Sequence, residues 1–121
     1  MSTYNKYYGL LSPVLKVALV ILEAEKEWED SCGSVDRWHG ISHSKIEERL
    51  AFDKSIRHYD VSRAQDILLD EGVLYPDDKL IEGTLDGEKC TFWARTYKIV
   101  SGEYVRRVLE DIYKSVHSVS D

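Results

Sequence analysis

The chain has 121 residues, of which 43% are hydrophobic and 31% are charged, and its formal net charge is −6 at pH 7. This length and composition fit one globular domain with a core of its own. The acidic balance argues against a nonspecific nucleic-acid coat or a polybasic membrane-surface protein, because both depend on a broad positive field.

Cysteine usage and hydropathy indicate a reduced, cytoplasmic setting. The two cysteines, Cys32 and Cys90, are too few for a disulfide framework and form no Cys-x-x-Cys pair. The longest apolar run, residues 17–22, is far shorter than the roughly 20 residues that span a bilayer. No basic leader with a cleavage site precedes this run. We therefore expect a cytoplasmic protein without a membrane partner.

The first expected element is a long helix from Pro13 to about Trp28, which follows a flexible arm of residues 1–12. Ser12 and Pro13 suit the N-cap and the first helical position. Apolar residues recur at three- and four-residue steps: Val14, Val17, Ala18, Ile21, Ala24 and Trp28. The first half of this helix is apolar on nearly all sides, so it should lie deep in the core or under a second subunit.

Two shorter helices are expected next. Residues 30–40 are polar and aperiodic, which predicts a loop that can end in a short strand near residues 38–41. A helix of about nine residues then begins with Ser42 or Ser44 as its cap. Residues 52–59 connect this helix to the following one.

The third helix should begin with Asp60 or Ser62 as its cap and continue to Glu71. Gly72 can supply the left-handed residue that ends many helices, and residues 73–74 return the chain to the core. The apolar side chains expected on its buried face are Val61, Ala64, Ile67 and Leu68.

A hairpin follows the third helix. Residues 80–85 and 89–99 are rich in β-branched and aromatic side chains, which favours strands. Asp86 and Gly87 between them suit the primed turn of a two-residue hairpin loop. Large side chains at the far end of the second strand are expected to pack on the helices: Trp93, Tyr97 and Ile99.

The last helix, about residues 101–118, carries one continuous apolar stripe. Its members are Val105, Val108, Leu109, Ile112, Tyr113 and Val116. A stripe of this size exceeds what one small domain must cover, which favours a homodimer through this helix. The alternative is packing of the stripe on the first helix of the same chain. The expected fold class is mainly α with a small antiparallel β hairpin.

Residues 42–99 carry a resemblance to a known family. The features are Ser44, Ile46 and Leu50 in the second helix, Val61-Ser62-Arg63-Ala64 opening the third, Ile67-Leu68-x-x-x-Gly72-Val73-Leu74 closing it, and the hairpin that follows. This part of the chain resembles the winged helix-turn-helix superfamily of small prokaryotic and archaeal transcription regulators. The resemblance implies one domain over residues 13–121, with a helix-turn-helix over about 42–74, a wing over about 79–99, and terminal helices that build a dimer.

The resemblance also implies a function, namely sequence-specific binding of duplex DNA by a homodimer that regulates transcription, without a cofactor. The N-terminal end of the third helix would enter the major groove. The residues expected to contact DNA are Lys45, Lys54, Arg57, His58, Tyr59, Ser62, Arg63, Gln65 and Lys89. Arg63 is the first candidate for base contact, through guanine, and Gln65 the second, through adenine. Hydroxyls and lysines suit phosphate.

Charge leaves an alternative open. Residues 42–65 carry five Lys/Arg against four Asp/Glu, which permits DNA binding without requiring it. Arg63 could instead lie on a solvated face, paired with Asp60, Asp66 or Asp70. The overall acidity and the acidic wing tip, residues 86–88, support a protein-protein adaptor or an acidic antagonist that does not bind DNA.

Other chemistry finds little support in the sequence. Cys32, Asp36, His39 and His43 have metal-ligating side chains, and Cys90 could join them, but their spacing fits no strong zinc pattern, so a polar loop is expected. The sequence contains no Gly-rich phosphate loop, nucleophile elbow or His-Glu-x-x-His motif, which argues against an enzyme. Five aromatic residues could line an effector pocket or simply form the core: Trp28, Trp38, Phe92, Trp93 and Tyr97.

Overall fold

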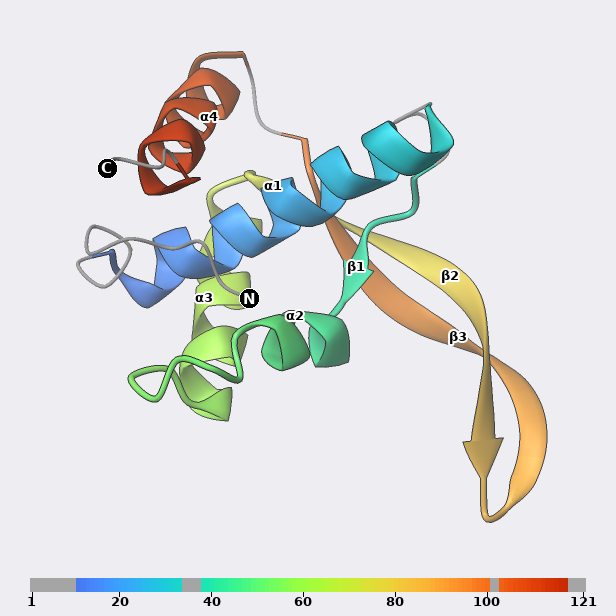
Figure 1. Cartoon of the computed structure of the whole chain (residues 1–121). Coiled ribbons are helices and arrows are strands. Elements are labelled where there is room, and N and C mark those ends of the chain that lie inside the picture. The colour runs from blue at the N-terminus through green and yellow to red at the C-terminus, as the bar shows by residue number, and fades with distance from the viewer. Residues whose placement is uncertain (1–10, 34–37, 101–102, 118–121) are drawn as a thin grey trace.

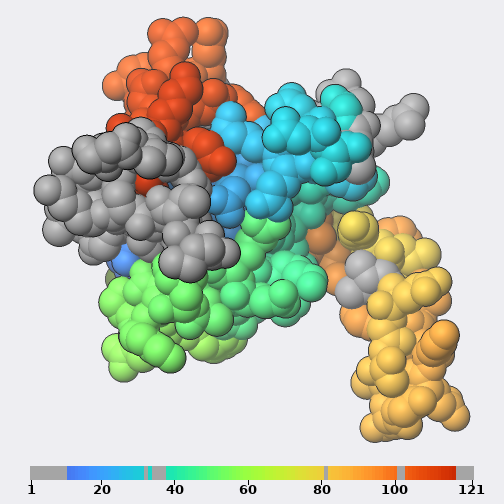
Figure 2. All heavy atoms as spheres, in the orientation of Figure 1, coloured from blue at the N-terminus to red at the C-terminus, as the bar shows by residue number. Residues whose placement is uncertain are grey.

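The computed structural model describes residues 11–33, 38–100 and 103–117 and has a mixed α/β architecture (Figure 1). Its elements are α1 (Pro13–Cys32), β1 (Ile41–Ser42), α2 (His43–Arg49), α3 (His58–Asp70), β2 (Leu74–Leu85), β3 (Glu88–Ile99) and α4 (Glu103–His117). The three described strands form an antiparallel sheet in the order β1-β3-β2. The helices gather around α1, and the β2–β3 hairpin projects away from them (Figures 1 and 2). The predicted hairpin is confirmed, whereas the architecture is mixed α/β rather than mainly α.

The first helix lies in the middle of the core. The hydroxyl of Ser12 accepts a hydrogen bond from the backbone N–H of Leu15 at 3.3 Å, which confirms the predicted cap. Residues 17–22 are all buried, so this half is covered within the chain. The helix extends beyond its predicted end, and most of the expected arm, residues 1–10, lies outside the described residues. None of the described helices has the length and apolarity needed to cross a membrane.

An arginine fork holds α2 against α1. Arg49 Nη2 lies 2.6 Å from Glu27 Oε1, and Arg49 Nη1 lies 3.1 Å from Glu27 Oε2 and 3.2 Å from Glu23 Oε1. The hydrogen bonds from Arg49 lower the pKa of the Glu27 carboxyl against the opposing effect of its partial burial. At its other end, α2 begins at Ser42, one of the two predicted caps, whose hydroxyl accepts from the N–H of Lys45.

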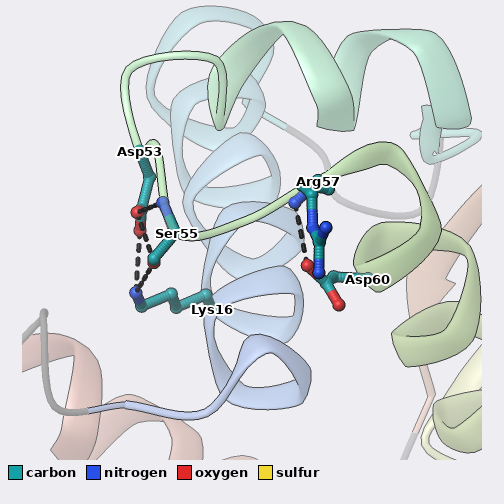
Figure 3. A network of polar contacts seen from close by, with 5 residues as sticks. All are labelled: Lys16, Asp53, Ser55, Arg57 and Asp60. Carbon is teal, nitrogen blue, oxygen red and sulfur yellow. Dashed lines mark hydrogen bonds and ion pairs between the residues drawn. The ribbon is translucent and has the colours of Figure 1, made fainter.

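The third helix begins earlier than predicted. Neither Asp60 nor Ser62 is its N-cap, because the first turn forms upstream and the cap position is Arg57. The Asp60 carboxylate reaches back to the backbone N–H of Arg57 at 2.9 Å, so it supports the first turn from inside the helix (Figure 3). At the other end, Gly72 has a φ of +74°, which confirms the predicted left-handed stop.

One apolar prediction on α3 is wrong. Val61, Ala64 and Leu68 are buried as expected, but Ile67 is 37% exposed and Gln65 is buried. The buried stripe follows positions 61, 64, 65 and 68, which is helical spacing, and residue 67 lies off that stripe. Helix phase, rather than hydrophobicity, decided which of the two side chains entered the core.

The hairpin is longer and less covered than predicted. Its strands pair from Leu74 opposite Ile99 to Leu85 opposite Glu88. Asp86 and Gly87 have φ values of +53° and +84°, which confirms the predicted primed turn. Ile99 is buried and Tyr97 packs against the core, but Trp93 is 69% exposed. The prediction that Trp93 packs on the helices was therefore wrong; its neighbour across the strands is Leu80.

The stripe of α4 turns largely inward. Leu109 and Val116 are buried in the core of the same chain, and Ile112 and Tyr113 pack against that core. Val105 and Val108 stay exposed. Four of the six predicted dimer contacts therefore serve packing within the chain, which was the alternative interpretation.

Charged contacts add to the packing between α1 and α4. Arg106 pairs with the buried carboxylate of Glu25 and, at 3.4 Å, with Glu110. Lys26 lies 3.8 Å from Glu110 and 5.4 Å from the centre of the Tyr113 ring. A buried carboxylate requires a cationic partner, and α4 supplies it.

Candidate nucleic-acid interface

One side of α3 is free of the core. Its buried stripe packs on α1, and α2 lies beside it beneath α1 (Figure 1). Most of the predicted DNA-contacting residues around its first turns are exposed: Lys54, Arg57, His58, Tyr59 and Arg63. Ser62 is half-buried. The structure therefore places this part of the predicted site on one helix end and the loop that leads into it.

Arg63 lies on this exposed side. Its Nη1 donates a hydrogen bond to the hydroxyl of Tyr59, one turn earlier, at 3.2 Å. Among the described residues, no ion pair joins Arg63 to Asp60, Asp66 or Asp70, which were its alternative partners in sequence. A guanidinium has five N–H donors, so the contact with Tyr59 leaves donors available for a ligand.

Gln65 does not belong to the exposed face. Its side chain is 4% exposed, and its Oε1 lies 3.0 Å from Nδ1 of His43 in α2. A buried amide cannot hydrogen-bond the edge of a base in the major groove. The prediction that Gln65 contacts adenine therefore does not fit its position, because residue 65 falls on the buried stripe of the helix.

The sign of charge changes along α3. Arg57 precedes the helix and Arg63 lies in its first half, where the Asp60 carboxylate accepts from the backbone N–H of Arg57, whereas Asp66, Asp70 and Glu71 are exposed toward its C-terminal end. Phosphate attracts the first group and repels the second. An anionic polymer can therefore approach only one end of this helix favourably.

The two remaining predicted lysines lie apart from α3. Lys45 on α2 pairs with Glu48 at 3.4 Å, and both side chains are exposed. Lys89 pairs across the hairpin with Thr84, close to the turn. Figure 2 shows that this end of the hairpin projects away from the helices, so Lys89 is not gathered with Arg63.

Both faces of the projecting hairpin carry apolar side chains, which the sequence analysis missed. Leu80 and Trp93 are cross-strand neighbours on one face, and Leu85 and Phe92 lie on the other. All four are exposed. The feature of the sequence that could have indicated this exposure is the length of the two strands, because long strands extend past the helices that pack on them.

An open pocket of about 530 Å³ lies where α1, the start of α2 and the hairpin meet. Trp28 and Trp38 are among its lining residues, together with the charged side chains of Glu27, Lys45 and Arg49. The other aromatic residues proposed for an effector pocket, Phe92, Trp93 and Tyr97, are not among them. The aromatic set is therefore divided between this pocket, the core edge and the hairpin.

The histidines have partners other than those considered from sequence. His39 lies 3.4 Å from Asp77, whereas His43 faces Gln65 and Glu47. Asp36 and the side chain of Cys32 lie outside the described residues. The structure instead brings His43 together with Glu47 and His58. The spacing of His43 and Glu47, one helical turn apart, could have indicated part of this cluster from the sequence. His58 joins them only because the packing of α2 and α3 brings it close.

Comparisons of the chain with protein-family models, with curated proteins and with solved structures found no match.

Proposed function

We propose that this chain is a sequence-specific duplex-DNA-binding regulator of transcription, built as a winged helix-turn-helix. One observation carries the proposal: Arg63 is exposed on α3, contacts Tyr59, and is in no ion pair formed among the described residues. An arginine fork matches the O6 and N7 atoms of guanine in the major groove. Recognition helices of this kind contact base edges through their N-terminal residues.

Element order and charge support the same interpretation. The helices α2 and α3 are followed directly by a hairpin, which is the order of a helix-turn-helix with a wing. Arg57 and Arg63 lie toward the N-terminal end of α3 together with the capping carboxylate of Asp60, and further acidic side chains lie toward its C-terminal end. The proposed contact surface consists of Lys54, Arg57, His58, Tyr59, Ser62 and Arg63. Gln65 leaves the set because it is buried.

A homodimer remains part of the proposal. Most of the α4 stripe is used inside the chain, so a dimer through α4 would use the apolar side chains that stay exposed: Tyr104, Val105 and Val108. Two copies of α3 would then have to lie about 34 Å apart to meet successive major grooves on one side of DNA.

The test is binding of the purified chain to duplex DNA at low salt, starting from a randomised pool from which bound sequences are selected. We expect the affinity for the selected duplex to fall steeply with added salt. Arg63→Ala should weaken it by about 5- to 160-fold, which corresponds to about 1–3 kcal/mol.

Arg107→Ala is the matched control, because Arg107 is an exposed arginine on α4 that pairs with Glu103 at 3.1 Å. The same charge is removed, but from another helix, so binding should change little. Failure of the wild type to bind any duplex at low salt, or equal losses in the two variants, would contradict the proposal.

A second function, recognition of a protein through the hairpin, is favoured by the exposure of Leu80, Leu85, Phe92 and Trp93. The net charge of −6 also suits a basic protein partner better than DNA. This function gains support if no duplex binds at low salt and if a partner that the wild type retains is lost by Trp93→Ser. A folded Trp93→Ser variant that keeps the same partner would argue against it.

A further inference from the structure

Three side chains with metal-ligating atoms meet where α2 faces the start of α3. His43 and Glu47 lie one turn apart on α2, and His58 is the first residue of α3. One ligand atom from each lies within 4.8 Å of the others. We propose that His43, Glu47 and His58 form a binding site for a divalent transition-metal ion such as Zn²⁺.

The atoms converge on a small volume. His43 Nε2 lies 3.2 Å from Glu47 Oε1, and His58 Nδ1 contacts the other oxygen of the same carboxylate. The two imidazole rings have their centroids 5.2 Å apart at an angle of 88°. Ligands at about 2.1 Å from a tetrahedral zinc ion are about 3.4 Å from one another. The pair on α2 already has nearly this separation, and the 74% exposed His58 side chain has room to adjust.

A buried residue orients His43. His43 Nδ1 lies 3.0 Å from the side-chain amide of Gln65, which is a hydrogen-bond distance. The other ring nitrogen, Nε2, lies on the side of Glu47. Metal-bound histidines commonly donate their other N–H to an acceptor of this kind.

Gln65 is a buried polar residue beside His43. Its Nε2 is buried and has no hydrogen-bond partner within the part of the chain that the structure describes. An unpaired buried amide group destabilises the fold. Holding His43 in one ring orientation gives a reason for a glutamine at a position of α3 that otherwise packs apolar side chains.

The Glu47 carboxylate contacts both imidazole rings, so it would contribute negative charge to a cation held by all three residues. Two histidines and one glutamate with an open fourth position are a known ligand set for Zn²⁺, and the exposed His58 leaves the cluster accessible to solvent.

A metal ion here would join α2 to α3 across residues 50–57, at the N-terminal end of the exposed face of α3. Binding to the folded chain alone would raise its stability. The proposal does not depend on DNA binding, because the ligands and Gln65 are defined by their own contacts.

The experiment uses the full chain after treatment with a chelator, titrated with ZnCl₂ by calorimetry and with CoCl₂ by visible absorption. We expect one ion per chain, a Co²⁺ spectrum typical of a four-coordinate nitrogen and oxygen site, and a higher midpoint of thermal unfolding with Zn²⁺. His58→Ala should lower the Zn²⁺ affinity at least tenfold and abolish the thermal shift. Because His58 is exposed, this variant should keep its fold.

His39→Ala is the matched control, since His39 is an exposed histidine that pairs with Asp77 outside the cluster. It should bind Zn²⁺ as the wild type does. Glu47→Gln, checked for its fold by circular dichroism, should also lose affinity. The proposal is overturned if the wild type binds no Zn²⁺, or if folded His58→Ala and Glu47→Gln bind it as tightly as His39→Ala.

Discussion

Lys16 of α1 and Asp53 of the segment between α2 and α3 form an ion pair with 2.7 Å between Nζ and Oδ2, and their side chains are only 4% and 12% exposed. Ser55 completes the contact by donating its hydroxyl and its backbone N–H to Asp53 Oδ1 at 2.6 and 3.0 Å (Figure 3). The pair fixes residues 50–57 on α1. It therefore helps to determine where α3 begins and how its exposed face is presented.

Removal of Asp53 should be costly. In Asp53→Ala the ammonium of Lys16 stays buried without this partner, so we expect a loss of about 3–5 kcal/mol in the free energy of unfolding. Asp78→Ala is the control, because Asp78 pairs with Arg95 at 3.8 Å in solvent and should lose less than about 1 kcal/mol. Urea unfolding measures both. Similar losses would contradict the role given to the buried pair.

The same carboxyl predicts a pH dependence. Burial by itself raises the pKa of Asp53, but the hydrogen bonds from Lys16 and Ser55 outweigh it and leave the pKa below its ordinary value. The unfolded chain, with an aspartate pKa of about 3.9, then binds more protons in acid than the folded chain. The contribution is complete above that value and is lost as pH falls through the lower pKa of the folded state.

Denaturation series from neutral to strongly acidic pH should therefore show a steeper fall in stability for the wild type than for Asp53→Ala below about pH 4. Other carboxyls, such as Glu27, have lowered pKa values and remain in both proteins. Parallel curves for the two proteins would contradict the prediction.

Gln65→Met tests the role of Gln65 in orienting His43 for metal binding separately from its effect on the stability of the fold. The change removes the hydrogen bond to His43, and we expect Zn²⁺ affinity to fall by about 10- to 100-fold. Loss of that bond, worth about 0.5–1.5 kcal/mol, is offset by removal of a buried unpaired amide that costs about 1–3 kcal/mol. Urea unfolding of the metal-free protein should show unchanged or slightly higher stability. Unaltered Zn²⁺ affinity would mean that Gln65 does not orient the site.

Two substitutions on α4 distinguish packing within the chain from contact between chains. Leu109→Ala should cost about 2–5 kcal/mol in urea unfolding, because Leu109 is buried in the core. Val108→Glu lies on the exposed side and should change stability by no more than about 0.5 kcal/mol. In a homodimer formed through α4, Val108→Glu should yield monomers by light scattering. A monomeric wild-type protein would contradict the prediction of a homodimer.

Local features of the chain were predictable because they depend on a few adjacent residues. Ser12 caps α1, Gly72 ends α3, and Asp86 with Gly87 forms the hairpin turn, as their side chains and backbone preferences require. The long apolar helix in the core was also predictable, since residues 17–22 leave no polar side to face water.

The start of α3 and its buried side were predictable only in part. Residues 57–62 contain more than one side chain able to support a helix start, and the structure places the N-cap at Arg57, shortly after the connection binds α1 through Lys16 and Asp53. A small shift in helix phase then buried Gln65 in place of Ile67. For this reason Gln65, the second candidate for base contact after Arg63, does not belong to the exposed face of α3.

The sequence by itself determined the approximate positions of the helices and of the hairpin, because periodicity and capping are local properties. The tertiary structure decided what covers each apolar face: α1 covers most of the α4 stripe, while Trp93 on the hairpin stays exposed. It also decided which distant side chains meet. Glu47 follows His43 by one helical turn, but His58 reaches them only because the packing of α2 and α3 brings it there.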